Sequence, residues 1–350
     1  MTENLDNVSE KRHLATVQVI KSLETIHGAD RILLATVLGW HAIVRLGEFS
    51  VGQKVVFFEP DSLIPCPPQP WNEFLWSSKD KDVTKPVRIR TMKMKKCVSQ
   101  GLVVAISAIP ALSPDTEVGT DVGDILGVTK WEMPIAANMR GLVKGAFPFF
   151  LKKTDTERIQ AYPDIIQEFK GRDVYGTLKI DGTSGTFYFR EGEFGVCSRN
   201  LDLKESDNVY WQMARKYTLP EKMAKLGGHY ALQGEVAGMS IQGNKLGLPD
   251  VQLFGFDVFD IAAGKYLGYQ DSRFIMIALG VTPVTTVFQG KWQWETSDDL
   301  IAYANGQDYA NKTPAEGVVF RPMEEAYSQT LDSRMAIKAI SPRFLLKYGE

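Results

Sequence analysis

A glycine-rich turn between two alternating apolar runs places the strongest constraint on how this chain can fold. The turn reads KIDGTSG over residues 179–185, and residues 174–178 and 186–189 flank it. This pattern predicts a β-hairpin, in which residues two apart point to the same side. Lys179 and Asp181 then share one face, and the glycines let a ligand approach the backbone closely. We interpret the bend as a candidate active site; the alternative is a weak, exposed lysine–aspartate pair.

Bulk composition narrows the class of protein. A chain of 350 residues has room for two domains, and 44% hydrophobic with 23% charged residues is typical of a soluble globular protein. Lysine and arginine number 40 against 42 aspartates and glutamates, which gives a formal net charge of −2. Any surface for a polyanion must therefore be a local patch.

Cysteine usage and the N-terminus suggest where the protein works. Cys66, Cys97 and Cys197 are far apart and odd in number, which fits neither a disulfide framework nor a metal-ligand cluster. Residues 1–10 are polar and acidic, and no apolar run is long enough to span a membrane. We expect an intracellular, cytoplasmic monomer with no membrane partner, and leave a nuclear location open.

The first third of the chain has the pattern of a small all-β domain. Short β-type runs are separated by glycine and proline, at 13–20, 32–38, 40–46, 54–59, 87–91 and 101–106. Five or six strands over this length suit an OB-type barrel, which we place at residues 12–135 after a disordered 1–11. An unidentified all-β domain is the alternative.

A proline-rich and then basic stretch lies inside this domain. Eight basic residues follow within eighteen positions: Lys79, Lys81, Lys85, Arg88, Arg90, Lys93, Lys95 and Lys96. They are the best candidates for a phosphate-contacting surface, and a solvated charged loop is the equal alternative.

The remaining chain alternates helix and strand patterns. A linker is expected at 136–152 and a second domain at 153–350. Residues 154–160 (TDTERIQ) resemble a capped helix start whose N-terminus could hold phosphate near Arg158. Further helices are expected at 213–225 and 298–304, and strands at 230–234, 252–259 and 317–320. The fold class is therefore α+β.

Four distant stretches add chemistry of one kind. Arg199 follows a strand-like run, and Glu235 and Glu316 each stand beside a glycine at a strand. FGFDVF at 254–259 is expected to place aromatic residues on one strand face and its aspartate on the other, and Lys338 lies in an apolar run. Each has an ordinary explanation alone. Together with the hairpin they supply the parts for attack on the α-phosphate of a nucleotide.

Read in order, these stretches resemble a known superfamily. KIDGTSG, SRN, GEVAG, FGFDVF, AEGVVFRP and AIKAISPRF are similar to motifs I, Ia, III, IIIa, IV and V of the covalent nucleotidyltransferases, which include ATP-dependent ligases and messenger-RNA capping enzymes. An OB domain ahead of the catalytic domain resembles the nick-sealing RNA ligase 5 group. The resemblance implies an ATP-grasp-like nucleotidyltransferase domain of antiparallel sheets flanked by helices.

The resemblance also implies roles for individual residues. Lys179 would attack ATP and carry AMP to an RNA 5′-phosphate, which a 3′-hydroxyl would then join, as in RNA repair. Asp181, Glu235 and Glu316 would hold Mg²⁺ or Mn²⁺ through water, and Phe256 would stack on adenine. A free lysine is almost fully protonated at neutral pH, so a metal and Lys338 would have to lower the pKa of Lys179. The implied ATP- and AMP-binding set is Lys179, Leu178, Ile180, Arg199, Glu235, Phe256, Val318, Lys338, Arg158 and Gln160, with Lys179, Lys338 and Arg199 catalytic.

Two features depart from the family pattern. Relatives often carry a second basic residue near the motif V lysine, where this chain has Ile340; Lys347 or Arg334 could substitute. The basic loop offers Lys93, Lys95 and Lys96 to RNA or to the β- and γ-phosphates of ATP, but lacks the usual glycine after an arginine. A DNA ligase or a capping guanylyltransferase is the enzymatic alternative, and an OB protein that only binds single strands is the non-enzymatic one.

Overall fold

The computed structural model describes residues 12–77, 82–131 and 141–349 and divides them into two compact units. The predictions for 1–11, Lys79, Lys81 and 136–140 lie outside the described residues. Residues 12–77, 82–131, 160–163 and 342–349 form the first unit, and 141–159 with 164–341 form the second. No described helix is long and apolar enough to span a membrane.

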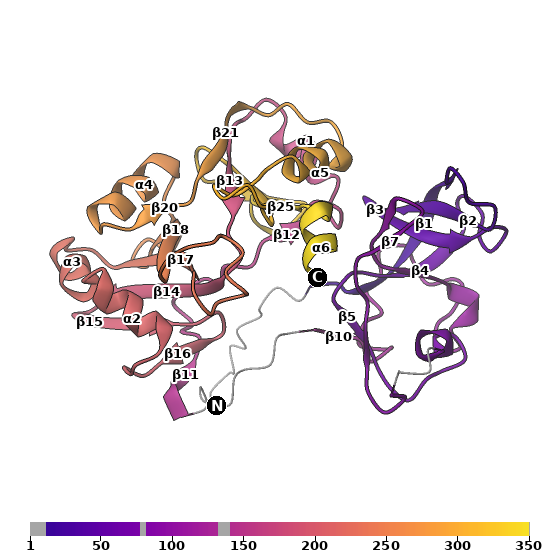
Figure 1. Ribbon diagram of the computed structural model, residues 1–350, viewed down its shortest axis with the longest axis horizontal. Coiled ribbons are helices and arrows are strands. Elements are labelled where there is room, and N and C mark those ends of the chain that lie inside the picture. Colours follow the sequence, from indigo (N-terminus) through magenta and orange to yellow (C-terminus); the bar gives the residue numbers. More distant parts are fainter. Residues whose placement is uncertain (1–11, 78–81, 132–140, 350) are drawn as a thin grey trace. The chain divides into compact units, whose positions relative to one another are not determined.

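The first unit is built on a five-stranded antiparallel sheet whose two faces are both buried (Figure 1). Val17 and Phe58 pack on one side, while Ile20 and Phe57 pack on the other. The ring of Phe58 stacks on Trp71 at 5.4 Å, so the proline-rich segment closes over this core. The sheet has the order β3-β2-β1-β4-β9, a smaller sheet has the order β10-β5-β6, and β7 pairs with β8.

The bounds of these elements agree closely with the expected β-runs. They are β1 Ala15–Thr25, β2 Ile32–Val37, β3 Trp40–Arg45, β4 Lys54–Phe58, β5 Ser62–Ile64, η1 Glu73–Trp76, β6 Val87–Arg88, β7 Met92–Met94, β8 Cys97–Ser99, β9 Leu102–Ala105, η2 Ile106–Ala108, β10 Thr129–Lys130 and α6 Pro342–Tyr348.

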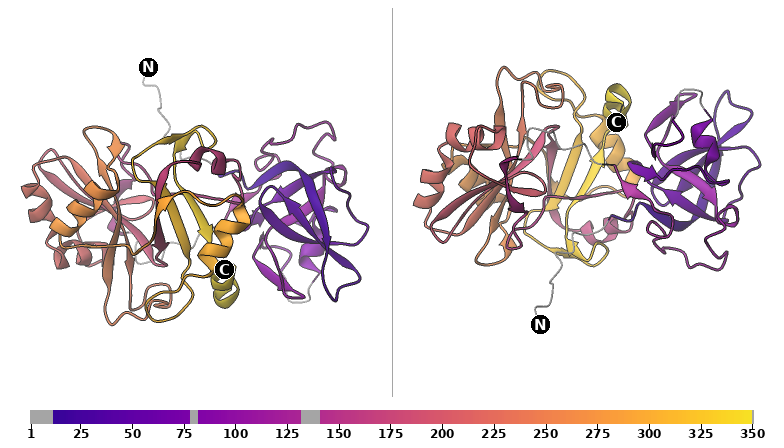
Figure 2. Two further views of the ribbon diagram at one scale, coloured as in Figure 1. Left: turned by 90° about the horizontal axis from the view of Figure 1, so that it is seen from above. Right: turned by 90° about the horizontal axis from the view of Figure 1, so that it is seen from below.

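The second unit contains one large antiparallel sheet with helices on one face. Its order is β11-β16-β15-β14-β17-β18-β19, and β20 pairs with β18 in parallel. Figures 1 and 2 show α2, α3 and α4 beside this sheet, where Trp211, Met223 and Met276 pack on Leu232. The elements are β11 Val143–Ala146, β14 Thr183–Arg190, β15 Glu193–Cys197, β16 Leu201–Leu203, α2 Val209–Lys216, α3 Leu219–Lys225, β17 Tyr230–Ala237, β18 Gln252–Asp260, β19 Lys265–Tyr266, α4 Tyr269–Ala278 and β20 Thr282–Pro283.

A second sheet of the same unit carries the lysine strand at its centre. Its order is β12-β25-β22-β13-β21, and an aromatic core of Trp292, Trp294 and Phe320 covers one face. A small β23–β24 hairpin follows. The elements are β12 Glu157–Arg158, α1 Ile165–Phe169, β13 Asp173–Lys179, β21 Thr286–Lys291, α5 Ser297–Asn305, β22 Gly317–Pro322, β23 Tyr327–Ser328, β24 Ser333–Arg334 and β25 Ile337–Ile340.

Strand register puts the chemistry-bearing residues on one face of this second sheet. Lys179 pairs with Gly317, and Lys338 pairs with Val319. Gly317 and Val319 are two apart on β22, so Lys179 and Lys338 point to the same side. Val318 points to the other side, into the aromatic core. A Cβ at Gly317 would lie 2.2 Å from the carbonyl oxygen of Ala339, so only glycine lets β22 approach β25 this closely.

Four sequence-based expectations need correction. The turn at residues 179–185 is not a β-hairpin, because β13 pairs with β21 and β22 in one sheet whereas β14 pairs with β15 and β17 in the other. Residues 180–182 carry the chain from one sheet to the other, and we call them the bend. Residues 154–160 are not a helix, because Glu157–Arg158 forms β12 and pairs in parallel with β25. The single helix expected at 213–225 is two helices, separated where Thr218 adopts a left-handed conformation and Pro220 begins the next turn. The expected linker also contains β11, which pairs with β16.

Asp257 lies on the opposite face from the one expected, because a β-bulge interrupts β18. Gly234 pairs with Gly255 but Gln233 pairs with Asp257, which leaves Phe256 as the extra residue. The carboxylate of Asp257 accepts hydrogen bonds of 2.9 Å from Arg321 and Arg334. Burial favours the neutral acid, but these two guanidinium groups outweigh it and hold the pKa of Asp257 below its ordinary value. This aspartate is structural.

Asp257→Ala should therefore destabilise the second unit strongly. It leaves the buried guanidinium of Arg321 without its counter-charge, while Arg334 keeps its pair with Glu325. Breaking such a buried pair costs about 3–5 kcal/mol of unfolding free energy. Asp173→Ala is the matched control, because Asp173 forms an exposed 2.8 Å pair with Lys291 that is worth less than about 1 kcal/mol. Thermal unfolding of both variants tests this, and equal shifts in Tm would contradict the structural role of Asp257.

Candidate active site

The end of β13 holds Lys179 against a carboxylate that stands just before the neighbouring strand β22. Its Nζ donates a 2.6 Å hydrogen bond to Oε2 of Glu316, which stands immediately before β22. One hydroxyl fixes both backbones: Tyr309 Oη donates to the carbonyl oxygen of Lys179 (2.7 Å) and accepts from the backbone N–H groups of Asp181 and Glu316 (3.1 Å each). Sequence reasoning missed Tyr309, because nothing in its local pattern distinguishes it from a core tyrosine.

A second lysine, Lys245, contacts the bend that follows Lys179. Nζ of Lys245 lies 2.8 Å from Oδ2 of Asp181, and both side chains are about nine-tenths buried, at 10% and 11% exposed. The carbonyl oxygen of Lys245 accepts hydrogen bonds from Asn311 (3.0 Å) and Thr313 (2.9 Å), which fix the loop between β17 and β18. Sequence reasoning missed Lys245 as well. Its position seven residues after GEVAG, in a glycine-rich loop, was the available signal.

Glu235 completes a set of three carboxylates around Lys179. It projects from β17 and pairs in register with Ser184 of β14, next to the bend. Burial is the largest influence and raises the pKa of Glu235 to about 8; Glu316 and Asp181 also raise it, against the lowering effect of Lys179 and Arg199. The glutamate therefore retains its proton at neutral pH in this arrangement.

A nucleophilic lysine needs a lowered pKa, but the same charges raise the pKa of Lys179. Burial lowers the pKa of Lys179, but Glu316, Glu235 and Asp181 more than offset this, so that its pKa lies above the ordinary lysine value. The protein's own groups keep the amine protonated. The expected lowering of the Lys179 pKa must then come from cations that arrive with the substrate.

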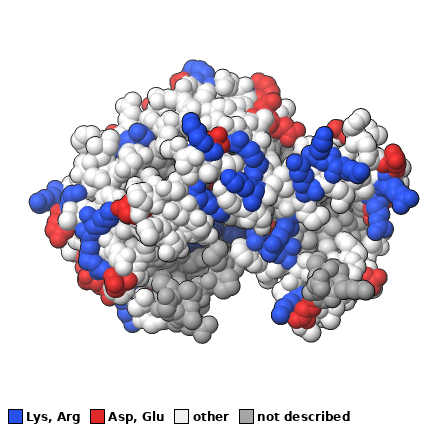
Figure 3. All heavy atoms as spheres, viewed as in Figure 1, with Lys and Arg blue, Asp and Glu red and all other residues white. Residues whose placement is uncertain are grey.

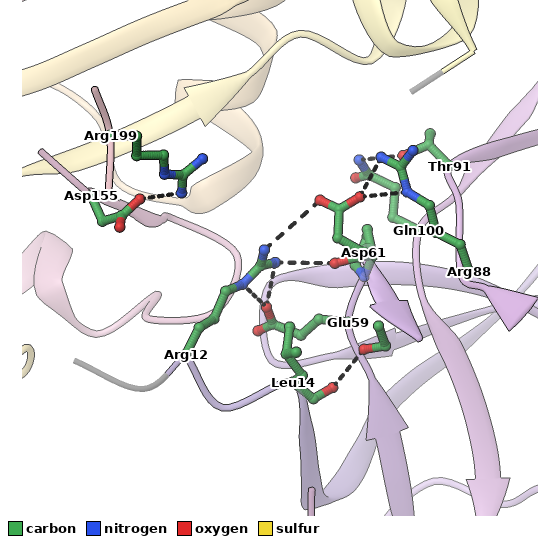
Figure 4. A network of polar contacts seen from close by, with 11 residues as sticks. Arg12, Leu14, Glu59, Asp61, Arg88, Thr91, Gln100, Asp155 and Arg199 are labelled. Carbon is green, nitrogen blue, oxygen red and sulfur yellow. Dashed lines mark hydrogen bonds and ion pairs between the residues drawn. The ribbon is translucent and has the colours of Figure 1, made fainter. Parts of the chain in front are cut away.

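The cationic residues expected at the site fall into two groups. Lys338 shares the face of Lys179 across two strand spacings, about 10 Å, and Arg158 pairs with Lys338 in the parallel β12–β25 ladder. Arg199 lies in the turn after β15 and forms an ion pair with Asp155 (Figure 4). Lys179, Lys338, Arg158 and Arg199 all belong to the second unit.

The expected apolar contacts need one correction. Val318 is fully buried in the aromatic core, because strand alternation turns it away from Lys179. Val319 occupies the face of the site instead, paired with Thr177 and Lys338. Leu178 is buried and shares the side of Val318 by register, while Ile180 is buried at the bend.

Phe256 is half-buried at the bulge of β18, on the strand that neighbours Glu235. Its adenine-stacking role stays a prediction. Gln160 is fully buried in the first unit, where its side-chain amide donates to Gln100 at 3.4 Å.

The basic stretch of the first unit divides into engaged and exposed residues. Figure 4 shows Arg88 directed at Asp61, with a 2.6 Å contact, and Arg12 directed at Glu59 and Asp61. Arg88 also stacks on Trp131 and Lys85 pairs with Asp82, so neither is available as a phosphate ligand in this arrangement. Lys93, Lys95 and Lys96 are exposed on the β7–β8 hairpin. Figure 3 shows both signs of charge scattered over the visible face of each unit.

The two candidate substitutes for a second motif V base are also engaged. Arg334 bonds to Asp257 and Glu325, and its guanidinium stacks on Tyr266 at 3.8 Å. Lys347 lies on α6, 5.2 Å from the ring of Tyr348. Arg334 is thus committed to the structural pair with Asp257.

The carboxylates suit a hydrated divalent cation better than a directly coordinated one. Across the described ranges, no group of three or more His, Cys, Asp or Glu side chains is arranged to hold a metal ion directly. Asp181, Glu235 and Glu316 nevertheless act together on one amine, and hard cations such as Mg²⁺ keep several waters and take few carboxylates. The donor set therefore fits the predicted contact through water.

Comparison with known proteins agrees with this fold. A family model described as RNA ligase matches residues 172–340, and an OB-fold domain model matches residues 14–106. No curated protein matches the chain.

Solved structures match over nearly the whole length. Naegleria gruberi RNA ligase with pyrophosphate is 34% identical, with a TM-score of 0.84 over 95% of this chain and 98% of that one. A mutant of that enzyme with ATP and Mn is 33% identical, with a TM-score of 0.85 over 96% and 98%. Another mutant with AMP and Mn is 34% identical, with a TM-score of 0.86 over 95% and 98%.

Fold and site thus define an OB-fold half-barrel followed by a nucleotidyltransferase-like domain, which confirms the predicted α+β class. The chain belongs to the RNA ligase family.

The raised pKa of Glu235 predicts a pH-dependent stability in the absence of divalent cations. Between the unfolded pKa of 4.5 and the folded pKa of about 8, only the folded state holds this proton, so stability should fall as pH rises through this window. Glu235→Gln should remove roughly 4 kcal/mol of that fall, at about 1.4 kcal/mol per pKa unit. Unfolding in EDTA at pH 5 and pH 8 measures it, with Glu193→Gln on β15 as the exposed control. Parallel pH profiles for wild type and Glu235→Gln would contradict the assignment.

Proposed function

We propose that this RNA ligase uses ATP to join RNA 3′-hydroxyl and 5′-phosphate ends at nicks in duplexes, through a covalent AMP on Lys179. The observation that carries the proposal is the Lys179 amine, which lies 2.6 Å from Glu316 and is influenced by three carboxylates. The relatives solved with ATP, AMP, Mn and pyrophosphate support the choice of nucleotide and metal.

The first step is nucleotidyl transfer to the lysine. The deprotonated amine of Lys179 attacks the α-phosphorus of ATP, an N–P bond forms, the bond to the bridging oxygen breaks, and pyrophosphate leaves. Glu316 holds the amine in place, and Tyr309 fixes the backbone on either side of the bend. Such positioning removes much of the entropic cost of attack.

Two further transfers regenerate the enzyme. An oxygen of the RNA 5′-phosphate attacks the phosphorus of the lysine adduct and Lys179 leaves, which gives an RNA end capped by AMP. The 3′-hydroxyl of the other end then attacks the RNA 5′-phosphorus, a phosphodiester forms and AMP leaves. Lys338 and Arg199 stabilise the phosphate charge that develops in these steps.

Asp181, Glu235 and Glu316 would hold Mg²⁺ or Mn²⁺ through water. When bound, the cation supplies positive charge that offsets these carboxylates and favours the neutral amine of Lys179. Phe256 would stack on adenine, and Val319 takes the place first assigned to Val318. The OB-fold domain would grip the strand beside the break, with Lys93, Lys95 and Lys96 as phosphate contacts.

A labelling experiment tests the covalent step. Incubation with α-labelled ATP and Mn²⁺ should leave labelled AMP on wild type but not on Lys179→Ala, because the proposal places the attacking amine on Lys179 alone. Lys291→Ala is the control, since that lysine lies in an exposed pair on β21. Equal labelling of Lys179→Ala and wild type would exclude the mechanism.

A substrate panel tests the choice of nucleic acid. Nicked duplexes that carry RNA or DNA on the 3′-hydroxyl side differ at the 2′-hydroxyl, so an RNA ligase should seal the RNA form faster. Preference for DNA ends would favour the DNA ligase alternative, and labelling by GTP alone would favour a capping enzyme.

Glu316→Ala should lower both lysine adenylylation and sealing by at least about 100-fold, because it removes the group that orients the nucleophile. Initial rates with ATP alone and with a pre-adenylylated RNA nick separate the steps. Glu324→Ala is the control, as Glu324 follows β22 outside this contact. Near-normal rates in Glu316→Ala would remove this glutamate from the site.

A further inference from the structure

Phe149 is the most exposed large hydrophobic side chain of the described residues, at 81%. A single exposed ring is common on protein surfaces and needs no explanation by itself. Its surroundings are unusual, however, because they are rigid, basic and connected to the active site.

The backbone around Phe149 is fixed on both sides. Phe147 and Leu151 are buried in one core cluster with Tyr188. The N–H of Phe147 donates to the carbonyl oxygen of Asn200 (3.1 Å), and the amide of Gln233 donates to the carbonyl oxygen of Lys152 (2.6 Å). The ring is therefore presented to solvent by an anchored turn, which lowers the entropic cost of binding to it.

Positive charge surrounds the ring. Phe149 packs edge-on against Phe150 with centroids 5.7 Å apart, and the guanidinium of Arg190 lies 4.5 Å from the centroid of Phe150. Lys152 and Lys153 follow in sequence and are exposed. Arg190 also donates hydrogen bonds to the carboxylate of the next residue, Glu191. Exposed aromatic rings beside basic side chains are the features with which proteins hold single-stranded nucleic acid.

Residues 149–154 lead from this ring toward the bend that follows Lys179. Phe150 contacts Tyr188 at one end, with centroids 5.4 Å apart, and Thr154 contacts Ser184 at the other, with 3.0 Å between hydroxyl oxygens. Residues 150–154 thus run along β14 toward its start. Tyr188 lies five residues from Thr183, which is about 17 Å of strand. A base on Phe149 would therefore lie a few nucleotides from the start of β14.

We propose that Phe149, with Lys152, Lys153 and Arg190, is a stacking site for one unpaired base of the RNA substrate, a few nucleotides from the reacting phosphate. The inference rests on the proposed RNA-joining function and adds breaks flanked by an unpaired nucleotide to the substrates that the enzyme favours. A paired base cannot stack on the ring, so a fully paired nick does not use this site.

Binding to a single-stranded RNA 12-mer in EDTA tests the site without any turnover. Phe149→Ala should weaken binding about 10-fold through lost stacking, and Phe149→Trp should restore it. Phe274→Ala is the matched control, because Phe274 is a 74% exposed phenylalanine on α4 of the same unit. The paired substitution Lys152→Ala with Lys153→Ala should reduce the slope of log affinity against log salt by about 1.4. Unchanged affinity in Phe149→Ala, or an equal loss in Phe274→Ala, would overturn the proposal.

Sealing assays separate this proposal from the proposed function. Wild type should seal a nick flanked by a short unpaired stretch faster than Phe149→Ala, while both seal a fully paired nick at the same rate. Lysine labelling with ATP alone reports whether each variant is folded. Failure of wild type to join any RNA would refute the proposed function. If wild type joins RNA and Phe149→Ala loses the same factor on both substrates, or on neither, the stacking site is refuted.

Discussion

The register between β13 and β22 is the constraint on which the active site depends. Pairing of Lys179 with Gly317 brings the amine beside Glu316, and a shift of one residue would turn Lys179 toward the aromatic core. Tyr309 holds this register, because its hydroxyl bonds to the backbone of Lys179 and of Glu316, at the adjoining ends of β13 and β22. The missing side chain at Gly317 lets β22 approach β25 closely on its other side. The chemistry is thus set by backbone geometry before any substrate binds.

The charge balance within this frame explains why cations matter to the reaction. Three carboxylates raise the pKa of Lys179, which is the reverse of what a nucleophile requires. Lys245 already stands against Asp181, so one of the three is partly compensated by the chain itself. A hydrated divalent cation would favour loss of the proton that Glu235 keeps in this arrangement, and three carboxylates would then be available to hold it. An incoming nucleotide and its metal would therefore complete the site electrostatically as well as chemically.

The sequence predicted local features well and long-range partners poorly. The glycine-rich turn at KIDGTSG, the strands of the first unit and the three site carboxylates follow from alternation, glycine placement and motif order. The strands on either side of that turn nevertheless join different sheets and do not form the predicted hairpin. The roles of Tyr309 and Lys245 depend on contacts 130 and 64 residues away from their partners, for which no local pattern exists. Other errors were local conflicts: TDTERIQ carries helix-start chemistry but pairs as a strand, and the bulge at Phe256 reverses the face of Asp257. Val318 and Val319 are alike in composition, and only the register separates them.

The central claim is that one amine of a lysine-rich site carries the nucleotide. The most direct measurement is to locate the adduct by tandem mass spectrometry after incubation with ATP and Mn²⁺ and digestion under alkaline conditions that preserve a phosphoramidate. The account predicts AMP on Lys179. AMP on Lys245 or Lys338, with Lys179 unmodified, would contradict it.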